Sequence, residues 1–150
     1  MEILLSLKPE YSDKIFSGEK KFEFRKRKPK HAFEVVLVYE SHPTKKIVGK
    51  FSVKKIISGS PRDVWKMCRK LGGIGKNDFF EYCGNEKTIY AFEIDKALRF
   101  DSPVDPSNLN PKFNPPQSFT YLNKSLLRAI NLGLNEANRF SDEFLSLINF

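Results

Sequence analysis

The sequence predicts an α+β fold built on a small β-barrel of about five to six strands, with inserted helices and a C-terminal helical extension. Three observations lead to this prediction. The length of 150 residues suits one domain, short β-rich runs recur, and Gly49 interrupts a long strand where a sheet must bend. A doubly wound α/β fold is the alternative, but the strands at 34–39 and 46–57 have too little chain between them for its helices.

The first third of the chain reads as strands around one helix. "EILLSLK" is short and apolar, as in a first strand, and Pro9 and Gly18 mark the two ends of a short helix. In "KKFEFRK", Phe22 and Phe24 alternate with charged residues, which predicts a half-buried strand. "FEVVLVYES" and "KKIVGKFSVKKIISG" predict the next two strands.

The pattern then becomes helical. "SPRDVWKMCRKLGG" has Ser60 as its N-cap and Val64, Trp65 and Cys68 on an apolar face, so packing of Trp65 in the core is expected. "GKNDFFEYCGN" predicts a short helix starting near Asn77 or Asp78, and "KTIYAFEIDKALRF" predicts a strand.

The last third begins with a segment rich in proline. Residues 101–117 hold five prolines and three asparagines, which predicts a long loop without regular structure. A helix follows from Asn123, and a break near Gly133 and Asn135 precedes a final helix with Phe140, Phe144 and Ile148. We expect residues 1–122 to form the barrel domain and residues 123–150 a helical extension packed on it, as a cap or as a dimer seam.

Composition excludes several classes of protein. No run is apolar enough to cross a bilayer, and the amino-terminal residues lack a cleavage site, so we expect a cytoplasmic protein without membrane contact. Cys68 and Cys83 lack CxxC spacing, and His31 and His42 are the only histidines that could serve as further metal ligands. Free thiols are therefore expected, and no metal or cofactor is predicted.

Positive charge is concentrated in the first two thirds of the chain. Residues 1–100 hold 22 Lys and Arg against 13 Asp and Glu, whereas residues 101–150 hold 4 against 5. A basic field of this kind most often serves nucleic acid, and a solvated lysine-rich surface is the alternative.

Four blocks in order resemble the ASCH domains of the PUA-like superfamily. They begin with the spacing G-x-K-x-x-E-x-R at Gly18, Lys20, Glu23 and Arg25, within "SLKPEYSDKIFSGEKKFEFRKR". The others are "VYESHPTKKIVGKF", "FFEYCGNEKTIYAFEI" and "PPQSFTYL", so the resemblance spans about residues 3–122. It implies a PUA-like β-barrel with a cleft beside the signature strand, and RNA or a nucleotide as partner. Some relatives are reported as amidohydrolases on acylated nucleosides or as metal-independent ribonucleases, so the family does not fix one activity.

The signature strand carries the first candidate site. Lys20 at the cleft mouth could meet phosphate or polarise a carbonyl, and Glu23 and Arg25, two apart on a strand, share a face. Glu23 could act as a base or accept hydrogen bonds from a nucleobase, and a barrel-closing ion pair with Arg25 is the alternative. In amidohydrolase relatives the position matching Glu23 can carry a threonine nucleophile, which is lacking here. Candidate phosphate contacts are Lys20, Lys21, Arg25 and the basic loop, residues 26–30, with Lys26, Arg27, Lys28 and Lys30.

A second set of candidates follows from the resemblance. Ribonuclease-like members use a Tyr, a Lys and a Ser at places that correspond to Tyr39, Lys45 and Ser118. RNA cleavage without a metal needs a base and a cation, which Tyr39 or His42 with Lys45 could supply; a packed tyrosine on a surface loop is the alternative. Phe113, Phe119 and Tyr121 could stack on bases or pack on the barrel.

Three hypotheses remain. The first is an RNA-binding or nucleotide-binding domain, and the second is a metal-independent hydrolase, a ribonuclease before an amidohydrolase. The third is a regulator that binds a protein through its carboxy-terminal helices.

Overall fold

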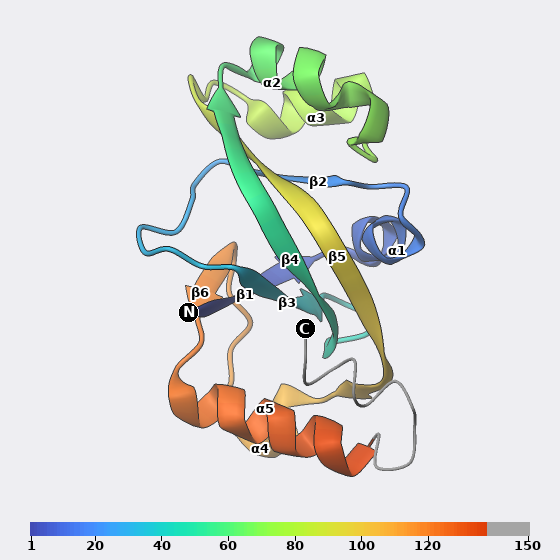
Figure 1. Cartoon of the computed structure of the whole chain (residues 1–150), viewed down its shortest axis with the longest axis vertical. Helices are drawn as coiled ribbons and strands as arrows, with labels where there is room; N and C mark the ends of the chain where they lie inside the picture. Colours follow the sequence, from blue (N-terminus) through green and yellow to red (C-terminus); the bar gives the residue numbers. More distant parts are fainter. Residues whose placement is uncertain (138–150) are drawn as a thin grey trace.

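The molecule is organised around one curled sheet of six strands (Figure 1). The computed structural model describes residues 1–137, and the side chains up to residue 132. The sheet order is β2-β5-β4-β3-β1-β6, and its strands are β1 (Glu2–Leu7), β2 (Phe22–Arg25), β3 (Val35–Glu40), β4 (Lys46–Gly59), β5 (Ile89–Val104) and β6 (Phe119–Tyr121). β1 and β3 are parallel and the other neighbours antiparallel. Because β2 and β6 are the two edges, the barrel is partly closed, which confirms the predicted fold class.

β4 and β5 form a long antiparallel ribbon that crosses the whole molecule (Figure 1). Their register shifts between Ile47 and Gly49 and twice more by Lys55, so the ribbon bends. A Cβ atom on Gly49 would lie 2.5 Å from the Leu98 carbonyl oxygen and 2.5 Å from the Phe16 ring. The glycine is therefore required by close packing at the bend, as the sequence predicted.

The helices lie beside this ribbon and at its two ends. They are α1 (Pro9–Ser17), α2 (Pro61–Cys68), α3 (Lys76–Cys83), α4 (Pro106–Leu109) and α5 (Lys124–Ala137), with a 3-10 turn at Arg69–Leu71. Figure 1 shows α2 and α3 at one end of the ribbon and α4 and α5 at the other. None of the helices within residues 1–137 is both long and apolar enough to span a membrane.

Local signals explain most helix ends. Gly18 ends α1 with φ of 87°, a conformation that glycine adopts without strain, and its N–H donates to the Ile15 carbonyl. The Ser60 side chain accepts from the backbone N–H of Asp63 at the start of α2. α3 begins at Lys76 with Gly75 as its N-cap, so Asn77 and Asp78 lie in its first turn, near the start that the sequence predicted.

Two predictions about the last third need correction. The segment 101–117 is not without regular structure, since β5 extends to Val104 and α4 follows. The predicted break near Gly133 and Asn135 is also wrong, because α5 continues from Lys124 to Ala137; one glycine costs a helix only about 1 kcal/mol. The predicted helix with Phe140, Phe144 and Ile148 lies outside the described residues.

Both faces of the central strands are buried. On β1, Ile3, Leu5 and Leu7 belong to one core cluster and Leu4 to another. The second cluster includes Ile130 of α5 and has Leu126 and Leu127 packed against it. A third cluster joins α2 and α3 to β2 and β5, and Trp65 packs there against Phe79, as predicted. The division at residue 122 stays a prediction.

Candidate functional site

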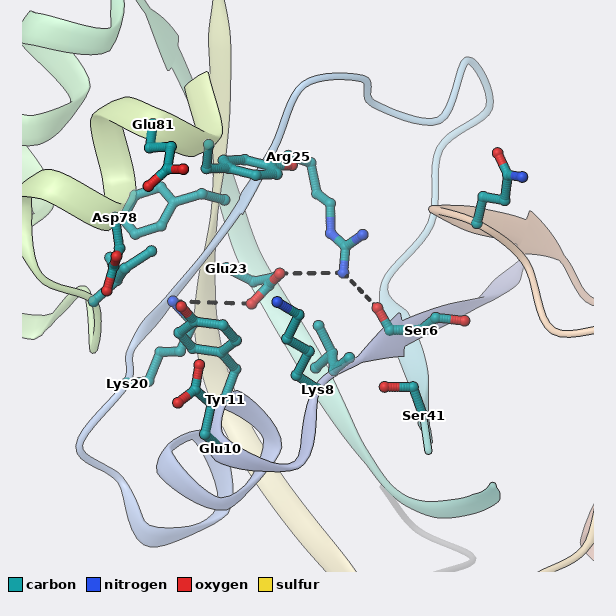
Figure 2. Close-up of a pocket in the computed structure, with 15 residues that line it drawn as sticks. Ser6, Lys8, Glu10, Tyr11, Lys20, Glu23, Arg25, Ser41, Asp78 and Glu81 are labelled. Atoms are coloured by element: carbon teal, nitrogen blue, oxygen red, sulfur yellow. Dashed lines mark hydrogen bonds and ion pairs between the residues drawn. The ribbon is translucent and has the colours of Figure 1, made fainter. Parts of the chain in front are cut away.

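A pocket of about 670 Å³ opens where β1, β2, α1 and α3 meet (Figure 2). Its charged walls are Lys8, Glu10, Lys20, Glu23, Arg25, Asp78 and Glu81. Apolar and aromatic surface comes from Leu7, Tyr11, Phe24, Ile74 and Tyr82, and the remaining polar residues are Ser6, Ser41 and Gln117. A volume of this size suits a small molecule or a single nucleotide.

Lys20, Glu23 and Arg25, which we call the signature cluster, all line this pocket and are nearly buried. Glu23 lies between the two cations: its Oε2 is 3.9 Å from Lys20 Nζ and its Oε1 is 3.2 Å from Arg25 Nη2. Figure 2 shows the carboxylate in this bridging position. The alternation in the sequence correctly grouped the charged residues on one face of β2, but that face is buried and not half-exposed.

Lys20 is more deeply buried than a residue at a cleft mouth. Only 2% of it is exposed, and its ammonium donates to the Gly72 carbonyl at 2.6 Å. It also lies over the Phe24 ring, 4.7 Å from the centroid. Burial lowers the pKa of Lys20, and the negative charge of Glu23 opposes that shift. The predicted position at the mouth is therefore corrected, although the residue still contributes to the pocket wall.

Gly73 makes the burial of Lys20 possible. A Cβ atom at this residue would lie 2.6 Å from Lys20 Cβ, and the backbone has φ of 63°. Glycine alone accepts both conditions without strain. The "LGG" turn at the end of η1 (Arg69–Leu71) thus covers the lysine.

Arg25 connects the two edges of the sheet. It belongs to the edge strand β2, and its guanidinium donates to the Ser6 carbonyl of β1 at 3.0 Å and to Ser118 Oγ at 3.4 Å. Ser118 directly precedes β6 at the opposite edge. Arg25 therefore closes by a side chain the gap that the backbone leaves open, and it faces the pocket while doing so.

The charge of the pocket is mixed. Three basic and four acidic side chains line it, so the lining of the pocket does not confirm the predicted basic cleft beside the signature strand. Glu10, Asp78 and Glu81 are exposed, whereas Glu23 is neutralised by its two cations.

The basic loop lies next to the pocket and is partly engaged by neighbours. Lys26 lies over the ring of Tyr82, a pocket residue, at 5.0 Å, and Lys28 lies over Tyr90 at 5.6 Å. Arg27 forms an exposed ion pair with Glu86 at 3.2 Å, and Lys30 is exposed. Lys21 is half-buried, and it is not among the pocket residues.

Of the second set of candidates, only Ser118 reaches the signature cluster, through Arg25. Tyr39 is 6% exposed and packs against Phe113 in the second core cluster. Lys45 is exposed in the turn before β4 with φ of 52°, near the exposed His42. Neither Tyr39 nor Lys45 lines the pocket, and their catalytic role stays a prediction.

The cysteines and the remaining aromatic residues have packing roles. Cys68 and Cys83 are free and buried, and burial raises the pKa of the Cys68 thiol to about 11, so that it stays protonated at neutral pH. Phe113, Phe119 and Tyr121 are half-buried and pack against core clusters. The arrangement favours packing over base stacking for these three.

A family comparison agrees with this site. The model of the ASCH domain matches residues 5–103, which include the whole signature cluster. The chain belongs to the ASCH domain family. A solved ASCH structure from Zymomonas mobilis superimposes with a TM-score of 0.80 at 26% identity, covering 86% of this chain and 92% of that one.

Two curated relatives differ in how far this ASCH chain covers them. An ASCH domain-containing ribonuclease from Zymomonas mobilis is 30% identical over 130 residues, which are 82% of this chain and 85% of that protein. A Ureaplasma parvum protein named ATP synthase subunit alpha is 31% identical over 121 residues, which are 80% of this chain and only 15% of that protein.

Several residues of the ASCH pocket were not predicted from the sequence. Asp78, Glu81 and Tyr82 are three and four positions apart on α3, a spacing that puts them on one helix face. That spacing was a usable signal. Tyr11 and Gln117 gave no signal of their own, although both lie inside blocks that resemble the family.

Proposed function

We propose that this ASCH domain binds single-stranded RNA and receives one nucleotide in the pocket of the signature cluster. The observation that carries the proposal is the position of Lys20, Glu23 and Arg25 together in the wall of a pocket large enough for a nucleotide. Single-stranded RNA suits such a pocket because its unpaired bases can turn away from the backbone.

The basic loop supplies phosphate contacts in this proposal. Arg27, Lys28 and Lys30 are exposed, and the loop touches the pocket wall through Lys26 and Tyr82. A phosphodiester chain that leaves the pocket on this side meets several cations. The net charge of +8 favours the approach of RNA from solution.

Salt dependence tests the proposal. Binding of a labelled single-stranded RNA, measured by fluorescence anisotropy, should weaken steeply as salt rises. The pair Arg27→Gln and Lys28→Gln should reduce the slope of log affinity against log salt by about 1 to 2. Lys112→Gln with Lys124→Gln is the control, because it removes the same charge from exposed positions outside the pocket wall.

The control pair should leave most of the slope unchanged. Absence of RNA binding, or affinity that does not depend on salt, would contradict the proposal. An equal loss in both pairs would show that net charge and not the basic loop attracts RNA.

A second candidate function is RNA cleavage without a metal, which the ribonuclease relative from Zymomonas mobilis favours. In such a reaction the 2′-oxygen forms a bond to phosphorus and gives its proton to a base, while the bond from phosphorus to the 5′-oxygen breaks and that oxygen takes a proton from an acid, which leaves a 2′,3′-cyclic phosphate. Tyr39, Lys45 and Ser118 are the candidates from the resemblance, and Lys20 and Glu23 are the candidates from the pocket. An amidohydrolase has less support, because the threonine of those relatives is missing at Glu23.

Incubation of single-stranded RNA with the protein in chelator separates the two functions. Cleavage that is lost in Lys45→Ala or Ser118→Ala, with RNA binding retained, requires an enzyme with the second set of residues. Cleavage lost only in Lys20→Ala or Glu23→Gln, with RNA binding retained, would assign the chemistry to the pocket. Binding without cleavage supports the first function, a domain that binds RNA without cleaving it.

The cytoplasmic location stays a prediction.

A further inference from the structure

The pocket has two ends of different charge, and this difference bears on which nucleotide it accepts. In Figure 2, Asp78 and Glu81 lie on the side of α3, while Ser6 and Ser41 lie on the opposite side with Lys8, Glu23 and Arg25 between them. A symmetrical anion site would not present exposed carboxylates to its ligand.

The part of the pocket away from α3, with Lys8 and Arg25, suits a phosphate. Arg25 is 7% exposed, and its Nε is buried without a hydrogen-bond partner among the described residues. α1 begins at the same place, and no side chain caps its N-terminus. The start of the helix adds partial positive charge beside Lys8, although Pro9 has no N–H and the N–H groups of Tyr11 and Ser12 already donate to the Lys8 carbonyl. The exposed Glu10 carboxylate lies in the same turn, so a phosphate is expected on the Arg25 side of Lys8.

The α3 end suits hydrogen-bond donors. Asp78 and Glu81 are exposed, and neither forms an ion pair or a side-chain hydrogen bond within the described part of the chain. Carboxylates repel a phosphate but accept hydrogen bonds from the amino group of a base, as they do from cytosine N4. The acidic end therefore repels the phosphates of the RNA backbone and favours the edge of a base that carries an amino group.

Two tyrosines provide the surface on which such a base can lie. Tyr11 and Tyr82 both line the pocket, and burial raises the pKa of each phenol, so both stay neutral. Stacking on aromatic rings tolerates every base, so it contributes affinity and not selectivity. Selectivity is left to the carboxylates.

We infer, on the basis of the proposed function, that the pocket selects a nucleotide whose base carries an exocyclic amino group, through Asp78 and Glu81. The phosphate then lies toward Lys8 and Arg25. Cytosine and uracil give the cleanest comparison, because they have the same size and opposite hydrogen-bonding groups: cytosine has an amino donor at position 4 and an acceptor at N3, whereas uracil has a carbonyl acceptor at position 4 and an N–H donor at N3. Carboxylates that face position 4 accept from the amino group of cytosine and repel the carbonyl of uracil.

The test measures the affinity of short oligomers of cytidine and of uridine by anisotropy at neutral pH. We expect the native protein to prefer cytidine by about five- to tenfold. In Asp78→Asn with Glu81→Gln the preference should fall to about one, because an amide can serve either base. Total affinity for uridine should rise in the same variant, since repulsion of RNA is removed.

Two controls make the result specific. Glu34→Gln with Asp101→Asn removes the same charge at exposed positions outside the pocket wall and should keep the preference. Arg27→Gln with Lys28→Gln should weaken both oligomers equally. Glu81→Gln alone, at an exposed position, should give an intermediate ratio if the double variant folds poorly.

Each outcome decides a different question. Equal affinity of the native protein for both oligomers overturns this inference and leaves RNA binding intact. A preference that survives in Asp78→Asn with Glu81→Gln also overturns it. Binding of neither oligomer contradicts the proposed function itself, and the inference falls with it.

Discussion

The signature cluster and the basic loop lie next to each other in the chain and use the same residue types, yet their surroundings differ. Lys20, Glu23 and Arg25 are at most 7% exposed and are held by contacts with distant parts of the chain. In the basic loop, the side chain of Arg27 is 69% exposed; it forms an ion pair with Glu86 and donates to the Lys26 carbonyl. Buried charges fix a geometry and are sensitive to the loss of a partner, whereas exposed charges mainly attract at a distance.

The largest effect should come from removing the central carboxylate. Glu23→Gln keeps the size of the side chain but leaves two buried cations without a counter-charge, and we expect the free energy of unfolding to fall by about 3 kcal/mol. Glu86→Gln is the matched change at the exposed pair and should alter stability by less than about 0.5 kcal/mol. Urea unfolding of both variants measures the difference in the free energy of unfolding. Equal losses in the two variants would contradict the view that the buried pair contributes more to stability than the exposed pair.

A somewhat smaller effect should follow from disturbing the cover of Lys20. Gly73→Ala places a Cβ atom 2.6 Å from Lys20 Cβ in a backbone conformation with positive φ, and we expect a loss of about 2 kcal/mol. Gly75→Ala, two residues on, has open space around its Cβ atom and should cost below about 1 kcal/mol as a changed N-cap. Thermal unfolding compares them; a harmless Gly73→Ala would mean that Lys20 is loosely covered.

The smallest effect is a dependence on alkaline pH. Because burial lowers the pKa of Lys20 in the folded protein, the unfolded chain binds more protons between that value and the ordinary 10.5. Stability should therefore gain a contribution as pH rises through this window, and Lys20→Met should lack it. The stability difference between the native protein and Lys20→Met, followed by urea unfolding over that range, isolates the effect. Parallel curves would show that the lysine is not desolvated.

The same two regions show what the sequence could predict. Local signals were enough for α1, α2 and β1 to β4, and for the first part of β5, because a cap or an alternation acts within a few residues. They did not predict the short strand β6. The family blocks correctly brought Lys20, Glu23 and Arg25 to one pocket. Their burial was not predictable, since it depends on Gly72, 52 residues from Lys20, and on Ser118, 93 residues from Arg25.

The proline-rich segment shows a different limit. Its prolines argued against a strand, yet β5 continues to Val104. The pairing of β4 and β5 jumps from Gly49 with Arg99 to Ile47 with Val104, so Pro103 lies in the irregular part of the register. A proline there does not have to donate to the ladder. The rule that proline avoids donor positions in a sheet is therefore obeyed. The sequence of β5 alone could not show this, because the position of the register shift depends on the partner strand β4.

The link that Arg25 makes from β2 to Ser6 and Ser118 has a mechanical consequence. A bound anion would attract the guanidinium of Arg25 away from the hydroxyl of Ser118. The contact between the two edges of the sheet would then loosen, and the distance between these edges would change. Occupancy of the pocket and the spacing of the two sheet edges are thus coupled through the side chain of Arg25. The rate of amide hydrogen exchange in the short strand Phe119–Tyr121 would then change when a ligand fills the pocket, although this strand does not line the pocket.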